Sequence, residues 1–332
     1  MPNIILEARN IKKWFTVRAG LLSSLLFNRE PTYIRAVDGV DLEIERGEVF
    51  ALAGQSGCGK TTIARLIVGL ETLTEGEIWF DGVKISGLRP SEFKPYRRRI
   101  QMIFQDPYGS LSNNMTIGEI IAEPLKIHQM CDSAEEEDEI VKRTLEDVGM
   151  RPAEDFVDRL PHELSGGQRQ RVAIGASLVL NPDLLVADEP VSMLDVSMRG
   201  QILKLLLDLQ KRKNITIILI THNLAVARQI SHRLAIIYLG RIMEVGETRK
   251  LIDDPRHVYT QALLSVVPVP ELDVSREKMV LSGEPPSPIN IPPGCRFAPR
   301  CPVATDRCRT EEPHLHRTGD GRLVACHRVE DN

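Results

Sequence analysis

The eight residues from Gly54 to Thr61, Gly-Gln-Ser-Gly-Cys-Gly-Lys-Thr, have the types and the spacing that bind phosphate. They lie between an expected strand at Val49–Ala53 and an expected amphipathic helix that runs through Leu70. Glycines let backbone N–H groups turn toward one centre, and the helix N-terminus adds its positive dipole end. Lys60 suits the β and γ phosphates, and the Thr61 hydroxyl suits Mg²⁺. We therefore assign nucleotide contacts to Gly54, Ser56, Gly57, Cys58, Gly59, Lys60, Thr61 and Thr62, with the Cys58 side chain expected to point away from phosphate.

A mononucleotide site also needs a carboxylate on a neighbouring strand to hold the metal. The apolar run Leu184–Asp188 supplies one, and a second carboxylate, Glu189, follows at once. Asp188 is the expected metal partner because it ends the strand. Glu189 is then placed to act as general base toward a water that faces the γ-phosphate.

A second glycine-containing segment, Leu164-Ser-Gly-Gly-Gln168, is expected at a helix start, which makes it a second anion site. Here the chain resembles the ABC ATPase family, whose signature is LSGGQ. The resemblance implies that two subunits meet head to tail and that each signature closes over the ATP held by the other. The residues that would act on the partner's ATP are Ser165, Gly166, Gly167 and Gln168.

Other family elements follow in order along the chain. Gln105 matches the glutamine loop, which senses Mg²⁺ and couples to the transport partner. Ser192–Asp195 resembles the D-loop with Met193 in place of the common alanine, and His222 matches the switch histidine. The resemblance thus implies catalytic roles for Lys60, Glu189 and His222, a nucleotide contact for Asp195, and Mg²⁺ contacts for Thr61, Gln105 and Asp188.

An aromatic residue near the N-terminus is expected to stack on adenine. Phe15 aligns with the family's stacking residue, and Trp14 is the alternative one position away. Side chains of a strand alternate between its faces, so we expect only one of the two to stack.

The pattern of elements predicts an α/β fold with a helix-covered parallel sheet over residues 1–267, and the resemblance to the ABC ATPases implies that this is a P-loop NTPase (RecA-like) core. An antiparallel β subdomain is indicated by runs that alternate between apolar and polar residues, at Ile4–Arg9, Val37–Ile44 and Glu77–Phe80. Buried strands are indicated by apolar runs at Ile215–Ile220 and Leu234–Leu239. Residues from about 106 to 180 are expected to form a helical subdomain, in which the acidic stretch Ala134–Glu139 opens a helix after Ser133. Residues 268–332 are expected to hold a Pro-rich linker, up to Pro293, and a Cys-rich C-terminal extension.

Composition narrows the class of protein. The 332 residues are 42% hydrophobic and 27% charged, with a net charge of −4, and we expect no nucleic-acid partner. The longest apolar runs, such as Leu21–Phe27, fall short of the roughly 20 residues that span a bilayer. The N-terminus has no charged region followed by an apolar one, so we expect no signal peptide and a cytoplasmic location.

Four of the six cysteines, Cys295, Cys301, Cys308 and Cys326, lie in the last 38 residues with the spacing C-x5-C-x6-C-x17-C. In a reducing cytoplasm such a group favours a metal over disulfides. Zinc and an iron–sulfur cluster both suit thiolates, but the gaps are wider than those of paired zinc knuckles. The spacing is similar to that of the C-terminal tail in one branch of the ABC family, and this resemblance implies a [4Fe–4S] cluster, which is our expectation; zinc, and cysteines without metal, are the alternatives.

The resemblance narrows to the ATPases of oligopeptide and dipeptide importers, in particular the F-type subunit. It is carried by Ala36–Val40, Ile100–Leu111, Val186–Ser192 and His257–Ser265. It implies a heterodimer with a second ATPase, two membrane permeases, an extracytoplasmic solute-binding protein and a peripheral position on the cytoplasmic face of the cell membrane. Import of oligosaccharides or another solute, an exporter, and a non-transport ABC ATPase are the alternatives. The chain departs from the family pattern at Ser112–Asn114 and at Ala176.

Overall fold

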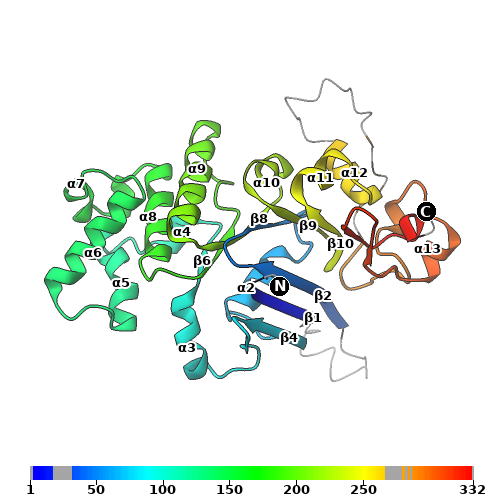
Figure 1. The fold of residues 1–332 in the computed structure, drawn as a ribbon, viewed down its shortest axis with the longest axis horizontal. Coiled ribbons are helices and arrows are strands. Elements are labelled where there is room, and N and C mark those ends of the chain that lie inside the picture. The colour runs from blue at the N-terminus through cyan, green and yellow to red at the C-terminus, as the bar shows by residue number, and fades with distance from the viewer. Residues whose placement is uncertain are drawn as a thin grey trace, which may run out of the picture. The chain divides into compact units, whose positions relative to one another are not determined.

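The computed structural model describes residues 3–17, 32–265, 279, 281, 283, 284 and 286–330. The run Leu21–Phe27 and most of the expected linker therefore lie outside the described residues. The chain divides into two compact units: the first holds residues 1–45, 50–87 and 221–332, and the second holds residues 46–49 and 88–220. Figure 1 labels the main helices and strands of both units.

An antiparallel sheet in the first unit takes up the N-terminal residues (Figure 1). Its order is β2-β1-β4-β5, with β1 Ile4–Val17, β2 Thr32–Glu45, β4 Glu75–Phe80 and β5 Val83–Lys84. Leu6 pairs with Phe80 on one side and with Ile44 on the other, and all three are buried. The expected antiparallel sheet is thus confirmed, with strands longer than the alternating runs alone indicated.

A second group of strands in the same unit has the order β11-β12-β10-β9-β3. Their bounds are β3 Val49–Ala53, β9 Arg233–Tyr238, β10 Arg241–Glu247, β11 His316–Arg317 and β12 Leu323–Val324. Strand β3 pairs in parallel with β9 and is buried throughout, which confirms the strand expected before the glycine-rich loop. The C-terminal strand β12 pairs with β10, so the C-terminal extension continues this group of strands.

Short helices complete the first unit. They are α2 Lys60–Ile67, α10 Leu224–Ile230, α11 Thr248–Asp253, α12 Val258–Ser265, η2 Ala298–Arg300, α13 Asp306–Thr310 and α14 His327–Glu330. Helix α2 ends at Ile67, not at Leu70 as expected, because the chain leaves helical geometry at Val68 and turns at Gly69, where φ is 70°.

The second unit has three parallel strands in the order β8-β7-β6, with β6 Ile100–Ile103, β7 Leu184–Asp188 and β8 Thr216–Thr221. Its helices are α3 Pro90–Arg99, α4 Pro107–Ser110, α5 Ile117–His128, α6 Ala134–Asp147, α7 Glu154–Val157, η1 Pro161–Glu163, α8 Gly166–Leu178 and α9 Val196–Lys213. Helices α5, α6 and α8 pack on one another. The Ser133 hydroxyl accepts a hydrogen bond from Glu136 N–H, which confirms the expected start of α6.

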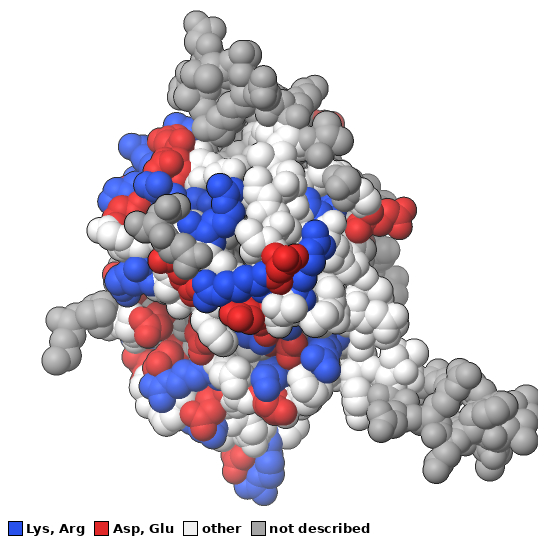
Figure 2. Space-filling model, turned by 90° about the vertical axis from the view of Figure 1, so that its right-hand side faces the viewer, with Lys and Arg blue, Asp and Glu red and all other residues white. Residues whose placement is uncertain are grey.

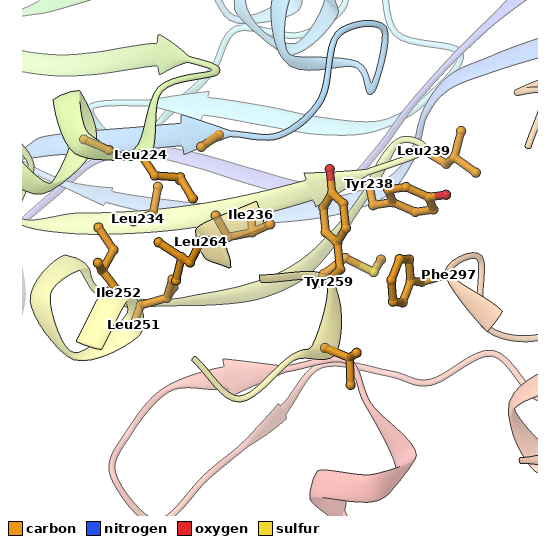
Figure 3. Packing of buried hydrophobic residues seen from close by; sticks show 14 of the residues in the cluster. Leu224, Leu234, Ile236, Tyr238, Leu239, Leu251, Ile252, Tyr259, Leu264 and Phe297 are labelled. Atoms are coloured by element: carbon orange, nitrogen blue, oxygen red, sulfur yellow. The ribbon is translucent and has the colours of Figure 1, made fainter. Parts of the chain in front are cut away.

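A buried cluster joins the C-terminal extension to the β9–β10 hairpin within the first unit (Figure 3). Tyr238, Tyr259 and Phe297 stand at its centre, with ring centroids 4.7 to 5.5 Å apart. Cys295 and Cys308 belong to the same cluster. Burial of large aromatic rings stabilises such packing, so this part of the C-terminal extension is fixed to the strands beneath it.

A buried ion pair forms a further link in the first unit. The Arg296 guanidinium contacts the carboxylate of Asp38, and both side chains are at most 6% exposed. Arg296 also donates to the carbonyl oxygen of Leu239, and Asp38 accepts from Trp14 Nε1 at 2.9 Å. The charges on both partners are therefore compensated inside the fold.

The surface carries charges of both signs. Figure 2 shows Lys and Arg lying among Asp and Glu on the drawn face, so neither sign covers that face alone. Among the described residues, no helix combines the length and the apolar character needed to cross a bilayer.

Candidate nucleotide site

The glycine-rich loop curls around the ammonium group of Lys60. Lys60 Nζ donates to the carbonyl oxygens of Gly54, at 2.7 Å, and Gln55, at 3.0 Å. Gly59 has a φ of 108°, and a Cβ there would lie 2.2 Å from the carbonyl oxygen of Ala36, so this position requires glycine. Helix α2 starts directly after Gly59. Its first-turn N–H groups have no partner within the helix and are available to an anion.

The remaining residues of the loop and of the first turn of α2 differ in exposure. Ser56 and Gly57 are exposed, Thr61 and Thr62 are half-buried on α2, and Cys58 is buried. The Cys58 sulfur lies 3.7 Å from Lys60 Nζ, so this thiol contacts the lysine that we assign to phosphate. Burial raises the pKa of the Cys58 thiol, so it stays protonated near neutral pH.

The two candidates for adenine stacking have different surroundings in the first unit. Trp14 donates its Nε1–H to Asp38, and the guanidinium of Arg35 lies 4.9 Å from its ring centroid. Phe15 is 37% exposed, with Lys13 Nζ 4.9 Å from its ring centroid. The Trp14 side chain is thus fixed by its contacts with Asp38 and Arg35, whereas the Phe15 ring is more exposed to solvent.

In the second unit, the two carboxylates follow one another at the end of β7. Asp188 is 2% exposed and ends the strand, and Glu189 is half-buried directly after it. Gln105 Nε2 donates to Glu189 Oε2 at 2.9 Å, so the structure brings the glutamine-loop residue to the candidate base.

The backbone of Glu189 is held in an uncommon conformation. Its φ is 48°, in the left-handed region that residues other than glycine rarely adopt. Glu189 N–H donates to the carbonyl oxygen of Ile220, and the Glu189 carbonyl oxygen accepts from the backbone and the hydroxyl of Ser192. Such a strained residue persists only where its neighbours fix it, and this arrangement aims the carboxylate toward Gln105.

The signature segment begins α8 in the second unit, as expected. Ser165 is the N-cap residue: its hydroxyl accepts from Gln168 N–H at 3.3 Å, and Gln168 Oε1 accepts from Ser165 N–H at 2.9 Å. Ser165 itself is exposed and keeps its O–H to donate. Gly166 and Gly167 form the first turn, so the N-terminus of α8 is a second place where an anion can bind.

In the segment that resembles the D-loop, Met193 and Asp195 are exposed and Leu194 is buried. Asp195 directly precedes α9, and His222, which resembles the switch histidine, is also exposed. His222 follows β8 and belongs to the first unit, with Lys60 and Phe15. Gln105, Asp188, Glu189, the signature and Asp195 belong to the second unit.

The four cysteines of the C-terminal extension line one small cavity, together with His257 and His327. Burial, and then the neighbouring Cys308 and Cys326, raise the pKa of Cys295 to about 11. Cys301 and Cys326 shift in the same direction, with burial as the largest cause. Within the described residues, however, no three His, Cys, Asp or Glu side chains are close enough to hold a metal ion.

Two family models match the chain. Residues 37–192 match the model described as ABC transporter, and residues 243–308 match the model described as oligopeptide/dipeptide transporter, C-terminal region.

Curated relatives span nearly the full chain. The dipeptide transport ATP-binding protein DppF of Haemophilus influenzae is 44% identical over 98% of this chain and 97% of its own length. The oligopeptide transport ATP-binding protein AppF of Bacillus subtilis is 46% identical over 97% of both chains. Among solved structures, an ATP-binding cassette dimer in a post-hydrolysis state with ADP and Pi has a TM-score of 0.63 and 31% identity, covering 74% of this chain and 99% of its own. The similarity extends to the fold as well as the sequence.

Proposed function

Since the chain belongs to the ABC transporter family, in its oligopeptide/dipeptide branch, we propose that it is the ATP-hydrolysing subunit that powers a peptide importer. One observation supports the mechanism: α2 starts directly after the glycine-rich loop and α8 starts directly after Ser165, so each helix start has N–H groups that could bind an anion. One bound ATP needs only one of them. The second therefore serves the ATP of another subunit, through Ser165, Gly166, Gly167 and Gln168.

We assign the chemical roles from these positions. Lys60 and the N–H groups of the loop bind the β and γ phosphates, and Phe15 stacks on adenine, because Trp14 is held by Asp38. Glu189 accepts the proton of a water that attacks the γ-phosphate, and His222 contacts that phosphate. Asp195 contributes from the D-loop.

The candidate metal ligands fit Mg²⁺ by their chemistry. Thr61 offers a hydroxyl, Asp188 a carboxylate and Gln105 an amide oxygen, and Mg²⁺ prefers such oxygen ligands. Gln105 uses its Nε2 toward Glu189, which leaves its Oε1 for a metal. Bound Mg²⁺ would neutralise charge on the phosphate oxygens.

The proposed partners are a paralogous ATPase, which forms the heterodimer, two permeases and an extracytoplasmic solute-binding protein. The chain would lie at the cytoplasmic face of the membrane as a peripheral subunit, with an ATPase domain at 1–267 and a C-terminal region at 268–332.

We infer a peptide substrate, because the relatives DppF and AppF are named as dipeptide and oligopeptide transport ATP-binding proteins. Oligosaccharides or another solute are the alternative.

Affinity purification of the tagged chain from detergent-solubilised native membranes tests this proposal. We expect a second ATPase and two permeases to co-purify, and the complex to hydrolyse ATP only with Mg²⁺. A chain that remains alone, or a complex that hydrolyses ATP equally without Mg²⁺, would contradict it.

For the four cysteines we propose a [4Fe–4S] cluster. The four cysteines line one cavity, and burial raises the pKa of the Cys295, Cys301 and Cys326 thiols, so a bound cation would have to stabilise these three as thiolates. A single zinc ion, held by the four sulfurs at about 2.3 Å, is the alternative. A cluster offers each thiolate a separate iron, and it would tie the four segments together.

Anaerobic purification should therefore yield a brown protein that absorbs at about 400 nm, as an iron–sulfur cluster does, and contains about four iron atoms per chain. Cys301→Ser should lose the colour, whereas Cys131→Ser, outside the cavity, should keep it. A colourless chain with one zinc, or with no metal, would exclude the cluster.

A further inference from the structure

Gln55, the second residue of the phosphate loop, is held from the C-terminal part of the first unit. Its N–H donates to the hydroxyl of Tyr259 at 3.1 Å, and its side-chain Oε1 accepts from Arg300 Nη1 at 3.2 Å. Tyr259 lies on α12, and Arg300 ends η2, between Cys295 and Cys301. The two contacts thus connect the loop to residues 204 and 245 positions further along the chain.

Both contacting side chains are fixed by burial. Tyr259 is fully buried and Arg300 is 8% exposed. The Tyr259 ring packs on Tyr238 and Phe297, with centroids 4.7 and 5.3 Å away and ring planes tilted by 58° and 52°, and the three rings lie close together in Figure 3. Phe297 and Arg300 belong to the same short segment of the C-terminal extension. A densely packed interior does not yield easily, so these groups hold a constant position against Gln55.

The geometry of one peptide bond gives these contacts a role in nucleotide binding. The N–H of Gln55 and the carbonyl of Gly54 belong to the same planar trans peptide, and they point in opposite directions. The N–H is held by Tyr259, and the carbonyl oxygen accepts from Lys60 Nζ at 2.7 Å. The tyrosine hydroxyl therefore sets the direction in which the Gly54 carbonyl holds the lysine ammonium.

We propose that Tyr259 and Arg300 are positioning residues for ATP binding, which keep Gln55 and thereby Lys60 in the orientation that receives phosphate. The inference rests on the proposed ATPase function and extends it, because it makes the C-terminal extension a support of the phosphate loop.

The test measures ATP affinity of the full chain and the KM and kcat of the assembled complex. A net hydrogen bond contributes about 0.5–1.5 kcal/mol. Tyr259→Phe and Arg300→Met should each raise the Kd and the KM for ATP about twofold to tenfold, with kcat at saturating ATP nearly unchanged. Arg300→Lys should restore much of the affinity, because lysine can still donate to Gln55.

Gln55→Ala separates positioning from a general structural role. Alanine loses the amide oxygen that meets Arg300 but keeps the N–H that meets Tyr259. Arg300→Met should therefore have almost no further effect in the Gln55→Ala chain, whereas Tyr259→Phe should keep its full effect.

The matched controls are Ser265→Ala, on α12, and Arg307→Met, which removes contacts with Glu311 and Glu330 and none with Gln55. Affinities equal to those of the controls, or a full Arg300→Met effect in the Gln55→Ala chain, would overturn the proposal. Failure of the unaltered chain to bind ATP would instead refute the proposed function. If Tyr259→Phe does not fold, the Arg300 and Gln55 variants still decide the outcome.

Discussion

Replacement of Glu189 by glutamine should leave ATP binding intact and lower hydrolysis by about 10²- to 10⁴-fold. Glutamine has nearly the shape of glutamate but cannot take a proton from water. The contact with Gln105 and the backbone bonds to Ile220 and Ser192 should persist, because they do not require the negative charge. Binding of a labelled nucleotide and release of phosphate by the assembled complex measure the two effects separately.

A control variant distinguishes this effect from a general loss of charge. Glu135→Gln changes an exposed glutamate at the start of α6 and should leave both binding and hydrolysis unchanged. Turnover by Glu189→Gln at the rate of the unaltered chain would remove Glu189 as the base. Loss of binding together with turnover would assign it to nucleotide binding instead.

Replacement of Arg296 by methionine should lower the free energy of unfolding of the chain by about 3–5 kcal/mol at pH 7, because it removes the buried cation of Asp38 and leaves that carboxylate only the more exposed Arg35, 3.8 Å away, among its ion-pair partners in the described residues. Arg309→Met, an exposed arginine on α13, should cost much less. Urea unfolding measures both. A loss as small as that of Arg309→Met would mean that the ion pair does not stabilise the fold.

The double variant Arg296→Met with Asp38→Asn should recover much of the lost stability. Asparagine removes the buried charge and keeps an oxygen that can accept from Trp14 Nε1. Stability no higher than that of the single variant would show that Arg296 acts through its other contacts, such as the Leu239 carbonyl.

The pH dependence of the same variant has a definite sign. Burial by itself raises the pKa of Asp38, but hydrogen bonds from Arg296 and Trp14 lower it below its ordinary value. In the unaltered chain this group therefore adds stability above about pH 4, the ordinary pKa of an Asp, and that stability is lost as the pH falls through the lower folded pKa. Without Arg296, burial dominates, so the loss caused by Arg296→Met should be larger at pH 7 than at pH 4.

Local patterns in the sequence were sufficient to predict the elements around the phosphate loop. Strands β3 and β7 have the expected bounds, because a short apolar run between turn residues determines a buried parallel strand. Strands β8 and β9 differ from the expected runs by one residue at each end. Helix starts at Ser133 and Ser165 were predictable, since serine caps act on N–H groups three residues away.

Contacts between residues that are far apart in the sequence could not be predicted from local patterns. The Asp38–Arg296 pair spans 258 positions, and no periodicity of a single chain relates such residues. The contacts of Gln55 with Tyr259 and Arg300 are of the same kind. Strands β11 and β12 have two residues each, too few for any alternation to be seen.

The central claim is that this chain converts ATP hydrolysis into solute import. Peptide uptake into reconstituted vesicles tests it directly. The vesicle membrane contains the chain, its companion ATPase and the two permeases. The solute-binding protein and a labelled oligopeptide are added outside, and Mg²⁺-ATP is supplied on the side that the ATPases face. Peptide should accumulate with time, and the chain with Glu189→Gln should abolish accumulation. Uptake that proceeds equally without ATP or with Glu189→Gln, or rapid hydrolysis with no peptide uptake, would contradict the account.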